Sequence, residues 1–241
     1  MIAAILFDLG GTLWDDYASE RALWADMRSE LAKLGLQFSE DEFEQLVNRG
    51  IASYAPSLTR AILWSAVNGD YARYQKVLRV IINRIRLRLA QEFTQLCPLY
   101  PGVRELLAEL HGRYKLAVAS NNFADAQHWL KMLELDRYFD FVGLSEEVWL
   151  FKPDTRFYLH ILESVGADPK ESVMVGDRLD NDIFPCNRLG LTTVRVLSPP
   201  WDRQQPRFHA DVPHFTVAQV ASLREVLPHL ESGLPARSPN A

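Results

Sequence analysis

Short apolar runs at the start of the chain and throughout its second half predict buried strands. The first run, residues 2–7, is continuous rather than alternating and ends at Asp8, which is typical of a parallel strand covered on both faces. Similar runs occupy residues 115–120, 141–144, 172–176 and 192–197. Helical periodicity separates them, over residues 102–111, 123–134, 154–165 and 180–189. This alternation of strands and helices predicts an α/β fold built on a parallel sheet.

Residues 16–96 show a different pattern, with helical periodicity and no convincing strand. Ser39 and Glu42 have the spacing of a capping box at a helix start, and Asp70 is placed to cap a second, longer helix. The longer helix has apolar residues at helical spacing, and most of its arginines lie elsewhere around it. We therefore expect an all-helical insertion within the α/β fold.

The chain is thus predicted to have three parts. Residues 1–15 and 97–230 form the α/β core, and residues 16–96 form the helical insertion. Residues 231–241 are rich in Ser, Pro and Gly and lack periodicity, so we expect a flexible tail without chemistry.

Composition narrows the class of protein. The 241 residues are 48% hydrophobic, enough for a large core without structural metals or disulfides. A net charge of −5, with both signs spread along the chain, argues against nucleic-acid binding and against a basic membrane anchor, and favours a small-molecule partner. Cys97 and Cys186 are far apart and form no disulfide or metal motif, which indicates a reducing, cytoplasmic setting. The apolar run at residues 2–7 is too short for the core of a signal peptide.

Three carboxylates are predicted to meet at one edge of the sheet. Asp8 follows the first strand and precedes Gly10 and Gly11, and Asp177 follows the strand at residues 172–176, with Asp182 five residues further on. Parallel strands carry ligands at their carboxyl ends, and clustered carboxylates need a cation to offset their repulsion. Mg²⁺, which prefers oxygen ligands, is the natural choice. Each aspartate on its own is also compatible with a turn or a helix cap.

Two further strand ends carry polar groups. Ser120 and Asn121 present a hydroxyl, an amide and backbone N–H groups suited to phosphate oxygens, or form an ordinary Ser-Asn turn. Lys152 precedes Pro153, which fixes how the chain enters the next helix and aims the lysine at the site. The alternative is a solvated surface lysine.

Together these segments resemble the four motifs of the haloacid dehalogenase-like hydrolase superfamily, which consists mainly of phosphatases. In order, they are residues 7–13, Ser120-Asn121, Lys152-Pro153 and residues 175–183. The resemblance covers nearly the whole chain before the tail. It implies a Rossmann-like parallel sheet with helices on both faces, and it identifies residues 16–96 with the family's helical cap, inserted between the first two motifs.

The resemblance also implies roles for individual residues and a small phosphorylated substrate. Asp8 would attack phosphorus and form an aspartyl-phosphate that water hydrolyses. Ser120, Asn121 and Lys152 would hold the phosphoryl group. Mg²⁺ would be bound by Asp8, Asp177 and the backbone carbonyl of Gly10. Asp182 would be either a further ligand or a group that orients the ligands.

One position departs from the family pattern. Phosphatases of this family usually carry a second aspartate two residues after the nucleophile, where it protonates the leaving oxygen, and here Gly10 stands instead. The backbone carbonyl that would bind Mg²⁺ is retained, whereas the general acid is lost. Asp15 and Asp16 are near in sequence, although a solvated or capping role fits both better.

Three other functions share features with this sequence. Haloacid dehalogenases of the family lack the second aspartate, as this chain does. They differ from this chain in lacking the metal-binding acid, which Asp177 provides here. Phosphomutases move protons through the aspartate that Gly10 replaces. A non-catalytic binding module is favoured only by Gly10 itself.

Overall fold

The computed structural model describes residues 2–232, which fall into two compact units. Within the described residues, one unit joins residues 2–15 to residues 99–232, and the other is Asp16–Pro98. Among the described residues, we find no helix with the length and apolar character needed to cross a membrane.

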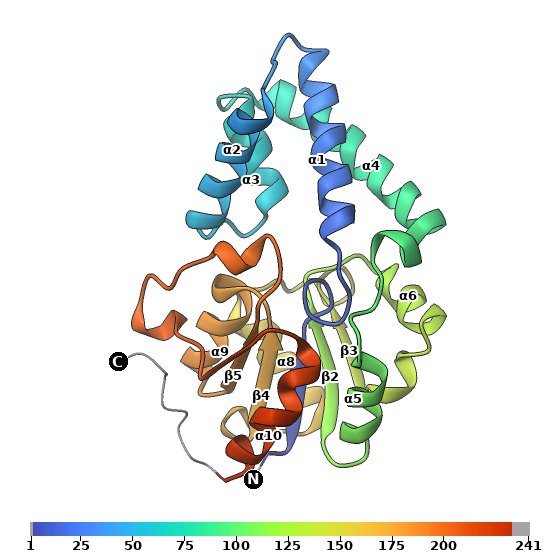
Figure 1. Ribbon diagram of the computed structural model, residues 1–241, viewed down its shortest axis with the longest axis vertical. Coiled ribbons are helices and arrows are strands. Elements are labelled where there is room, and N and C mark those ends of the chain that lie inside the picture. Colours follow the sequence, from blue (N-terminus) through green and yellow to red (C-terminus); the bar gives the residue numbers. More distant parts are fainter. Residues whose placement is uncertain (1, 233–241) are drawn as a thin grey trace. The chain divides into compact units, whose positions relative to one another are not determined.

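A six-stranded sheet with the order β3-β2-β1-β4-β5-β6 forms the first unit (Figure 1). Every neighbouring pair in it is parallel. The strands are β1 (Ala4–Phe7), β2 (Lys115–Ser120), β3 (Phe141–Leu144), β4 (Ser172–Gly176), β5 (Thr192–Val196) and β6 (Phe215–Val217). The first five lie within the runs that the sequence predicts. The edge strand β6 was not predicted, because three residues are too few to show a pattern.

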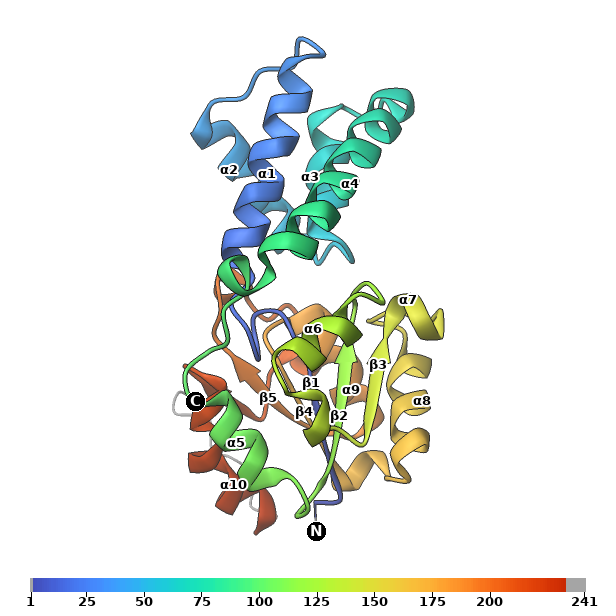
Figure 2. The same cartoon turned by 90° about the vertical axis from the view of Figure 1, so that its right-hand side faces the viewer.

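Helices cover both faces of this sheet, so the predicted fold class is confirmed. In Figure 2, α8 lies on one side of the sheet, and α5 and α10 lie on the other. The helices are α5 (Val103–Leu110), α6 (Ala126–Met132), α7 (Ser145–Val148), α8 (Thr155–Val165), α9 (Phe184–Leu189) and α10 (Leu223–Glu231). A π-helical turn, Leu179–Ile183, leads into α9. Glu231, assigned above to the tail, is the last residue of α10, and the tail from residue 233 onward lies outside the described residues.

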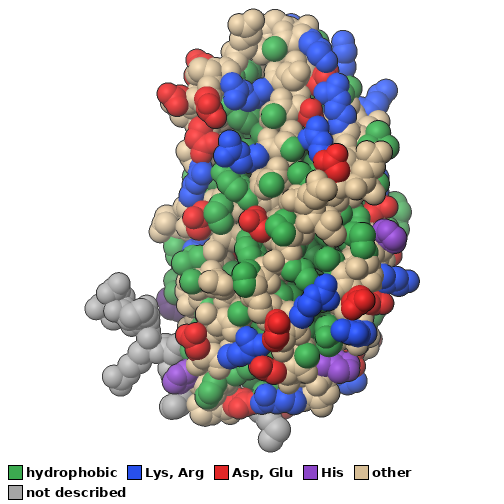
Figure 3. Space-filling view, turned by 45° about the vertical axis from the view of Figure 1, so that its right-hand side comes forward, with side chains coloured by type: hydrophobic (Ala, Val, Ile, Leu, Met, Phe, Trp, Pro, Cys, Tyr) green, Lys and Arg blue, Asp and Glu red, His purple; other side chains and the backbone are tan. Residues whose placement is uncertain are grey.

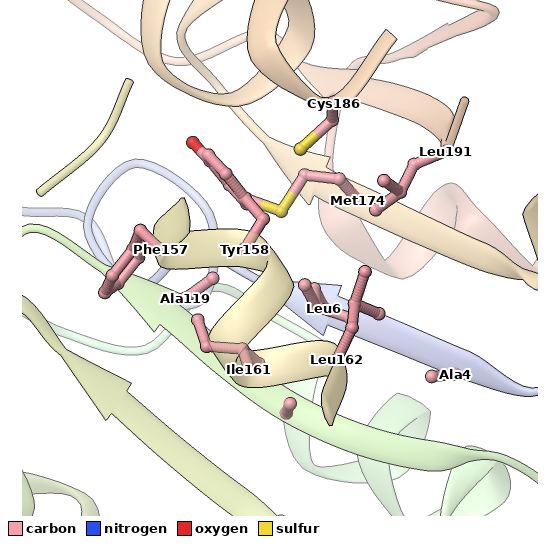
Figure 4. Close-up of a cluster of buried hydrophobic side chains, with 11 residues drawn as sticks. Ala4, Leu6, Ala119, Phe157, Tyr158, Ile161, Leu162, Met174, Cys186 and Leu191 are labelled. Carbon is pink, nitrogen blue, oxygen red and sulfur yellow. The ribbon is translucent and has the colours of Figure 1, made fainter. Parts of the chain in front are cut away.

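The core beneath α8 anchors one side of the sheet (Figure 4). Phe157, Tyr158 and Ile161 of α8 pack, fully buried, against alternate residues of the central strands, including Leu6 and Met174. Leu6 of β1 is paired in register with Met174 of β4, so both side chains point to the same face. This packing fixes α8 over the two strands whose ends carry Asp8 and Asp177.

The second unit is entirely helical within the described residues. Its helices are α1 (Tyr17–Ala32), α2 (Glu40–Ala52), α3 (Leu58–Ala66) and α4 (Tyr71–Leu96). The Ser39–Glu42 capping box is present at the start of α2, and the Asp70 side chain accepts a hydrogen bond from Arg73 N at the start of α4. Both predicted caps are confirmed.

Arginines of α4 pair with acidic residues of α1 rather than standing alone in solvent. Arg84 lies 2.7 Å from Glu30 and 3.6 Å from Asp26, and Arg88 lies 3.2 Å from Asp26. Figure 3 shows basic side chains over this helical unit with acidic ones among them. Such partly exposed pairs are each worth at most about 1 kcal/mol, so apolar packing supplies most of this unit's stability.

Candidate active site

The candidate site lies where two adjacent strands end. Phe7 of β1 and Val175 of β4 are paired in register, and Asp8 and Asp177 follow them at the same edge of the sheet. The backbone N–H of Asp8 also bonds the carbonyl of Val175, at 2.9 Å. Strand order reverses direction at this pair, because β2 and β3 lie on one side of β1 while β4, β5 and β6 lie on the other. Such switch points are where open parallel sheets bind ligands.

Asp8, Asp177 and Asp182 come together as the sequence predicts. Each offers a carboxylate oxygen, and these oxygens lie within 4.8 Å of one another. All three residues are buried, with exposed fractions of 8%, 3% and 0%. A buried, all-oxygen donor set of this size suits a hard divalent cation, so the residues present fit Mg²⁺.

Lys152 joins two of these carboxylates. Its Nζ lies 2.8 Å from Oδ2 of Asp8 and 2.6 Å from Oδ1 of Asp182. Burial alone lowers the pKa of Lys152, but the carboxylates of Asp182 and Asp8 outweigh burial and hold that pKa above its usual value. Lys152 is therefore a positively charged group at neutral pH, not the solvated surface lysine that the sequence also allowed.

Asp182 is held from two sides. Its Oδ1 accepts from Lys152, and its Oδ2 accepts from the backbone N–H of Arg178 at 3.0 Å. Complete burial raises the pKa of Asp182 to about 6, against the opposing effect of Lys152. The carboxylate thus depends on cationic neighbours to stay ionised.

Asn121 fixes the backbone of Lys152. The Asn121 side chain donates to the Lys152 carbonyl at 3.0 Å and accepts from the Lys152 N–H at 2.8 Å. With its side chain engaged in this way, Asn121 can offer its backbone N–H to a phosphate. Ser120, the last residue of β2, is buried beside β1, and Gly10 is half-buried in the loop after β1.

Two glycines make room for the carboxylates. A Cβ on Gly11 would lie 2.1 Å from Oδ2 of Asp177, and a Cβ on Gly176 would lie 2.4 Å from Cγ of Asp182. Gly11 also has φ +65°, which disfavours other residues. The sequence shows these glycines, but only the structure shows which carboxylate each one accommodates.

We expect Gly176→Ala to destabilise the protein and weaken metal binding together. The new methyl group would collide with the buried stem of Asp182 and pull its carboxylate from Lys152, at a cost of about 1–3 kcal/mol. Thermal unfolding with and without Mg²⁺ measures both effects. Gly50→Ala, in helix α2, is the control, because its close contact, at 2.6 Å, would be with the flexible end of the Leu58 side chain and not with a carboxylate. A Gly176→Ala protein with unchanged stability and unchanged Mg²⁺ affinity would contradict the prediction.

Sequence reasoning missed several residues around the site. The hydroxyl of Tyr158 in α8 donates to the carbonyl of Asn181, next to Asp182. Arg178 pairs with Asp180, and Gln204 contacts the same segment from a distant loop. Arg178 could have been suspected from its place beside Asp177, whereas nothing in the sequence marks Tyr158 or Gln204.

Comparison with known proteins identifies the family. The sequence profile described as haloacid dehalogenase-like hydrolase matches residues 2–190. The chain belongs to this family. The expectation of a haloacid dehalogenase-like hydrolase, drawn from the four motifs, is confirmed.

Curated relatives of the chain are named as phosphatases. It is 30% identical over 237 residues to the glyceraldehyde 3-phosphate phosphatase of Methanopyrus kandleri, covering 95% of this chain and 99% of the relative. It is 27% identical over 224 residues to the phosphoglycolate phosphatase of Aquifex aeolicus, covering 92% and 95%. Among solved structures, the magnesium-bound haloacid dehalogenase-like hydrolase YfnB of Bacillus subtilis superposes with a TM-score of 0.64 at 18% identity, covering 94% of this chain and 98% of that chain. This last similarity establishes the fold alone.

Proposed function

We propose that the protein is a Mg²⁺-dependent phosphatase that hydrolyses small phosphorylated molecules through an aspartyl-phosphate at Asp8. The observation that carries this proposal is the position of Lys152, whose ammonium lies between Asp8 and Asp182 in the buried carboxylate cluster. A carboxylate nucleophile beside a fixed cation is what phosphoryl transfer requires.

Asp8 is oriented for nucleophilic attack. Its Oδ1 accepts a hydrogen bond from the backbone N–H of Leu9 at 2.7 Å, and its Oδ2 faces Lys152. In the proposed reaction a carboxylate oxygen of Asp8 forms a bond to phosphorus while the bond from phosphorus to the leaving oxygen breaks. A water molecule then attacks the aspartyl-phosphate, which releases phosphate and regenerates the carboxylate.

The phosphoryl group would be held by three elements. Lys152 offers positive charge, Ser120 offers a hydroxyl at the end of β2, and Asn121 offers its backbone N–H. Because Lys152 is buried and paired, its charge is positioned before the substrate arrives. This arrangement favours the trigonal, charge-rich phosphoryl group of the transition state.

Mg²⁺ would be held by Asp8, Asp177 and the backbone carbonyl of Gly10. Both oxygens of Asp182 already accept hydrogen bonds, from Lys152 and from Arg178 N, so we assign Asp182 an orienting role. When bound, the ion neutralises charge on the phosphoryl oxygens and on Asp8. Asp177 also argues against a dehalogenase, since without a cation it would repel the charge on Asp8.

The relatives support a proposal for the substrate class. The two curated relatives described above are named for small phosphate esters, and their alignments with this chain run nearly from end to end. We propose a substrate of the same class, and we assign the helical insertion the role of the cap that selects it.

Metal removal tests the proposal. We expect treatment with a chelator to reduce hydrolysis of p-nitrophenyl phosphate by at least about 10²-fold, because the charge of a preorganised cation contributes at least that much. Added Mg²⁺ should restore the rate, and metal analysis of the treated protein serves as the control. A demonstrably metal-free protein that turns over at the original rate would rule out Mg²⁺ dependence.

A further inference from the structure

A buried polar network braces the part of the site that carries Asp177 and Asp182. We call residues 177–182 the acidic loop and residues 198–204, which follow β5, the bracing loop. The two loops are separated by a helix and a strand in the sequence, yet side chains tie them together at several points. Gln204, Trp201 and Arg195, which make these contacts from outside the acidic loop, do not belong to the four motifs of the family.

Gln204 uses both ends of its amide on the acidic loop. Its Oε1 accepts from the backbone N–H of Leu179 at 2.7 Å, and its Nε2 donates to Oδ1 of Asp180 at 3.0 Å. Only 1% of Gln204 is exposed, and losing its bond to Leu179 would leave a buried backbone N–H unsatisfied. Both contacts fall between Asp177 and Asp182 in the chain.

Trp201 contacts the acidic loop through the side chain of Arg178. The Arg178 guanidinium lies over the Trp201 ring, 3.8 Å from its centroid, and pairs with the Asp180 carboxylate at 2.6 Å. A guanidinium held between an aromatic face and a carboxylate has little freedom to move. The backbone N–H of the same Arg178 holds Asp182, so the ring and the Asp182 carboxylate are connected through one residue.

Arg195 of β5 donates hydrogen bonds to both loops. Its Nε donates to the backbone carbonyl of Asp177 at 3.3 Å, and one of its terminal nitrogens donates to the carbonyl of Trp201 at 2.6 Å. Arg195 is itself buried, with 7% exposed. It therefore fixes the backbone of Asp177 to the same bracing loop that holds Asp180 and Arg178.

We propose that Gln204 and Trp201, together with Arg195, are positioning residues that hold the acidic loop in the conformation that binds the divalent cation. The proposal rests on the proposed function, because it concerns the same metal site. The physical reason is repulsion, since Asp8, Asp177 and Asp182 crowd their charges together and an unbraced loop would relax by moving apart. Preformed ligands give up less conformational freedom when the cation binds, which raises affinity.

The decisive experiment measures Mg²⁺ binding directly. Gln204→Met keeps the length and burial of the side chain but removes both hydrogen bonds. We expect isothermal titration calorimetry to show a dissociation constant for Mg²⁺ raised by about 10-fold or more, as for other groups that orient metal ligands. The Mg²⁺-induced rise in melting temperature should shrink in parallel. Gln205→Met, at the exposed neighbouring position, is the matched control and should bind Mg²⁺ as wild type does.

Kinetics separate positioning from a general structural defect. At saturating Mg²⁺ the Gln204→Met enzyme should recover most of the wild-type kcat, with a higher Mg²⁺ concentration needed for half-activation. Trp201→Leu provides a second route if Gln204→Met does not fold. If both fold, the double variant should lose less Mg²⁺ affinity than the sum of the single losses, because both act through one loop.

The outcomes are distinct. Folded variants that bind Mg²⁺ with the wild-type affinity, or that lose kcat without losing Mg²⁺ affinity, would overturn the positioning role and leave the proposed function standing. A wild-type protein that binds no Mg²⁺ would overturn the metal site itself, and the positioning role with it.

Discussion

Replacing Asp8 with Asn should reduce phosphatase turnover by at least about 10⁴-fold while the fold is retained, since loss of a nucleophile typically costs that much or more. Asn preserves the size of the side chain and keeps an oxygen to accept from the N–H of Leu9. Lys152 keeps its pairing with Asp182, so the buried ammonium is not left without a carboxylate. What disappears is the carboxylate oxygen that would bond to phosphorus.

Two measurements accompany the turnover assay. Acid quenching during steady turnover, followed by mass spectrometry, should find a phosphorylated peptide containing Asp8 in wild type and none in the variant. Asp168→Asn is the matched control, because Asp168 is exposed and precedes β4, at the opposite end of the strand from Asp177. Near-normal turnover by the Asp8→Asn protein would disprove the covalent mechanism.

The cluster around Asp8 could be predicted because parallel strands bring their ends to one edge. Apolar runs located β1 and β4, and the residues that follow them then had to be neighbours, as the pairing of Phe7 with Val175 shows. No alternative register of these short strands would move both aspartates away from that edge. The convergence of Asp8, Asp177 and Asp182 was therefore accessible from sequence alone.

The way Lys152 is held was less accessible. Its approach to the site was predicted, but its complete burial between two carboxylates was not, because burial depends on what packs around the loop. The role of Asn121 shows the same limit, since a sequence names a residue without showing which of its atoms face a ligand. In the structure the Asn121 side chain bonds to the backbone of Lys152, so the contact with phosphate that we propose would use the backbone N–H of Asn121.

The bracing loop could not have been predicted. Gln204 reaches Leu179 and Asp180 across 24 or 25 residues from a segment with no periodicity, so no local pattern records the contact. Strand β6 was not predicted for a related reason, because it is three residues long and pairs only with β5. Both features depend on tertiary packing rather than on local propensity.

The Gly10→Asp variant should hydrolyse alkyl phosphates faster by about 10²–10⁴-fold, which is the usual contribution of a positioned general acid. Unlike Gly11, Gly10 does not have a positive φ, so its backbone accepts a side chain without strain. The gain should be far smaller for p-nitrophenyl phosphate, whose leaving group departs without a proton. The measurement is the ratio of kcat/KM for the two substrates in wild type and variant.

Gly10→Asn separates proton donation from the effect of filling space, because the amide has nearly the size of the acid and cannot donate a proton of comparable acidity. If Asn raises the rate on alkyl phosphates as much as Asp does, the gain reflects packing or hydrogen bonding and not acid catalysis. Wild type should accordingly favour aryl, acyl or anomeric phosphates, because their leaving oxygens need little protonation. Equal wild-type rates on both classes, unchanged by Gly10→Asp, would show that another group supplies the proton. Asp15, in the segment that follows the Gly10–Trp14 turn, would then be the first residue to replace.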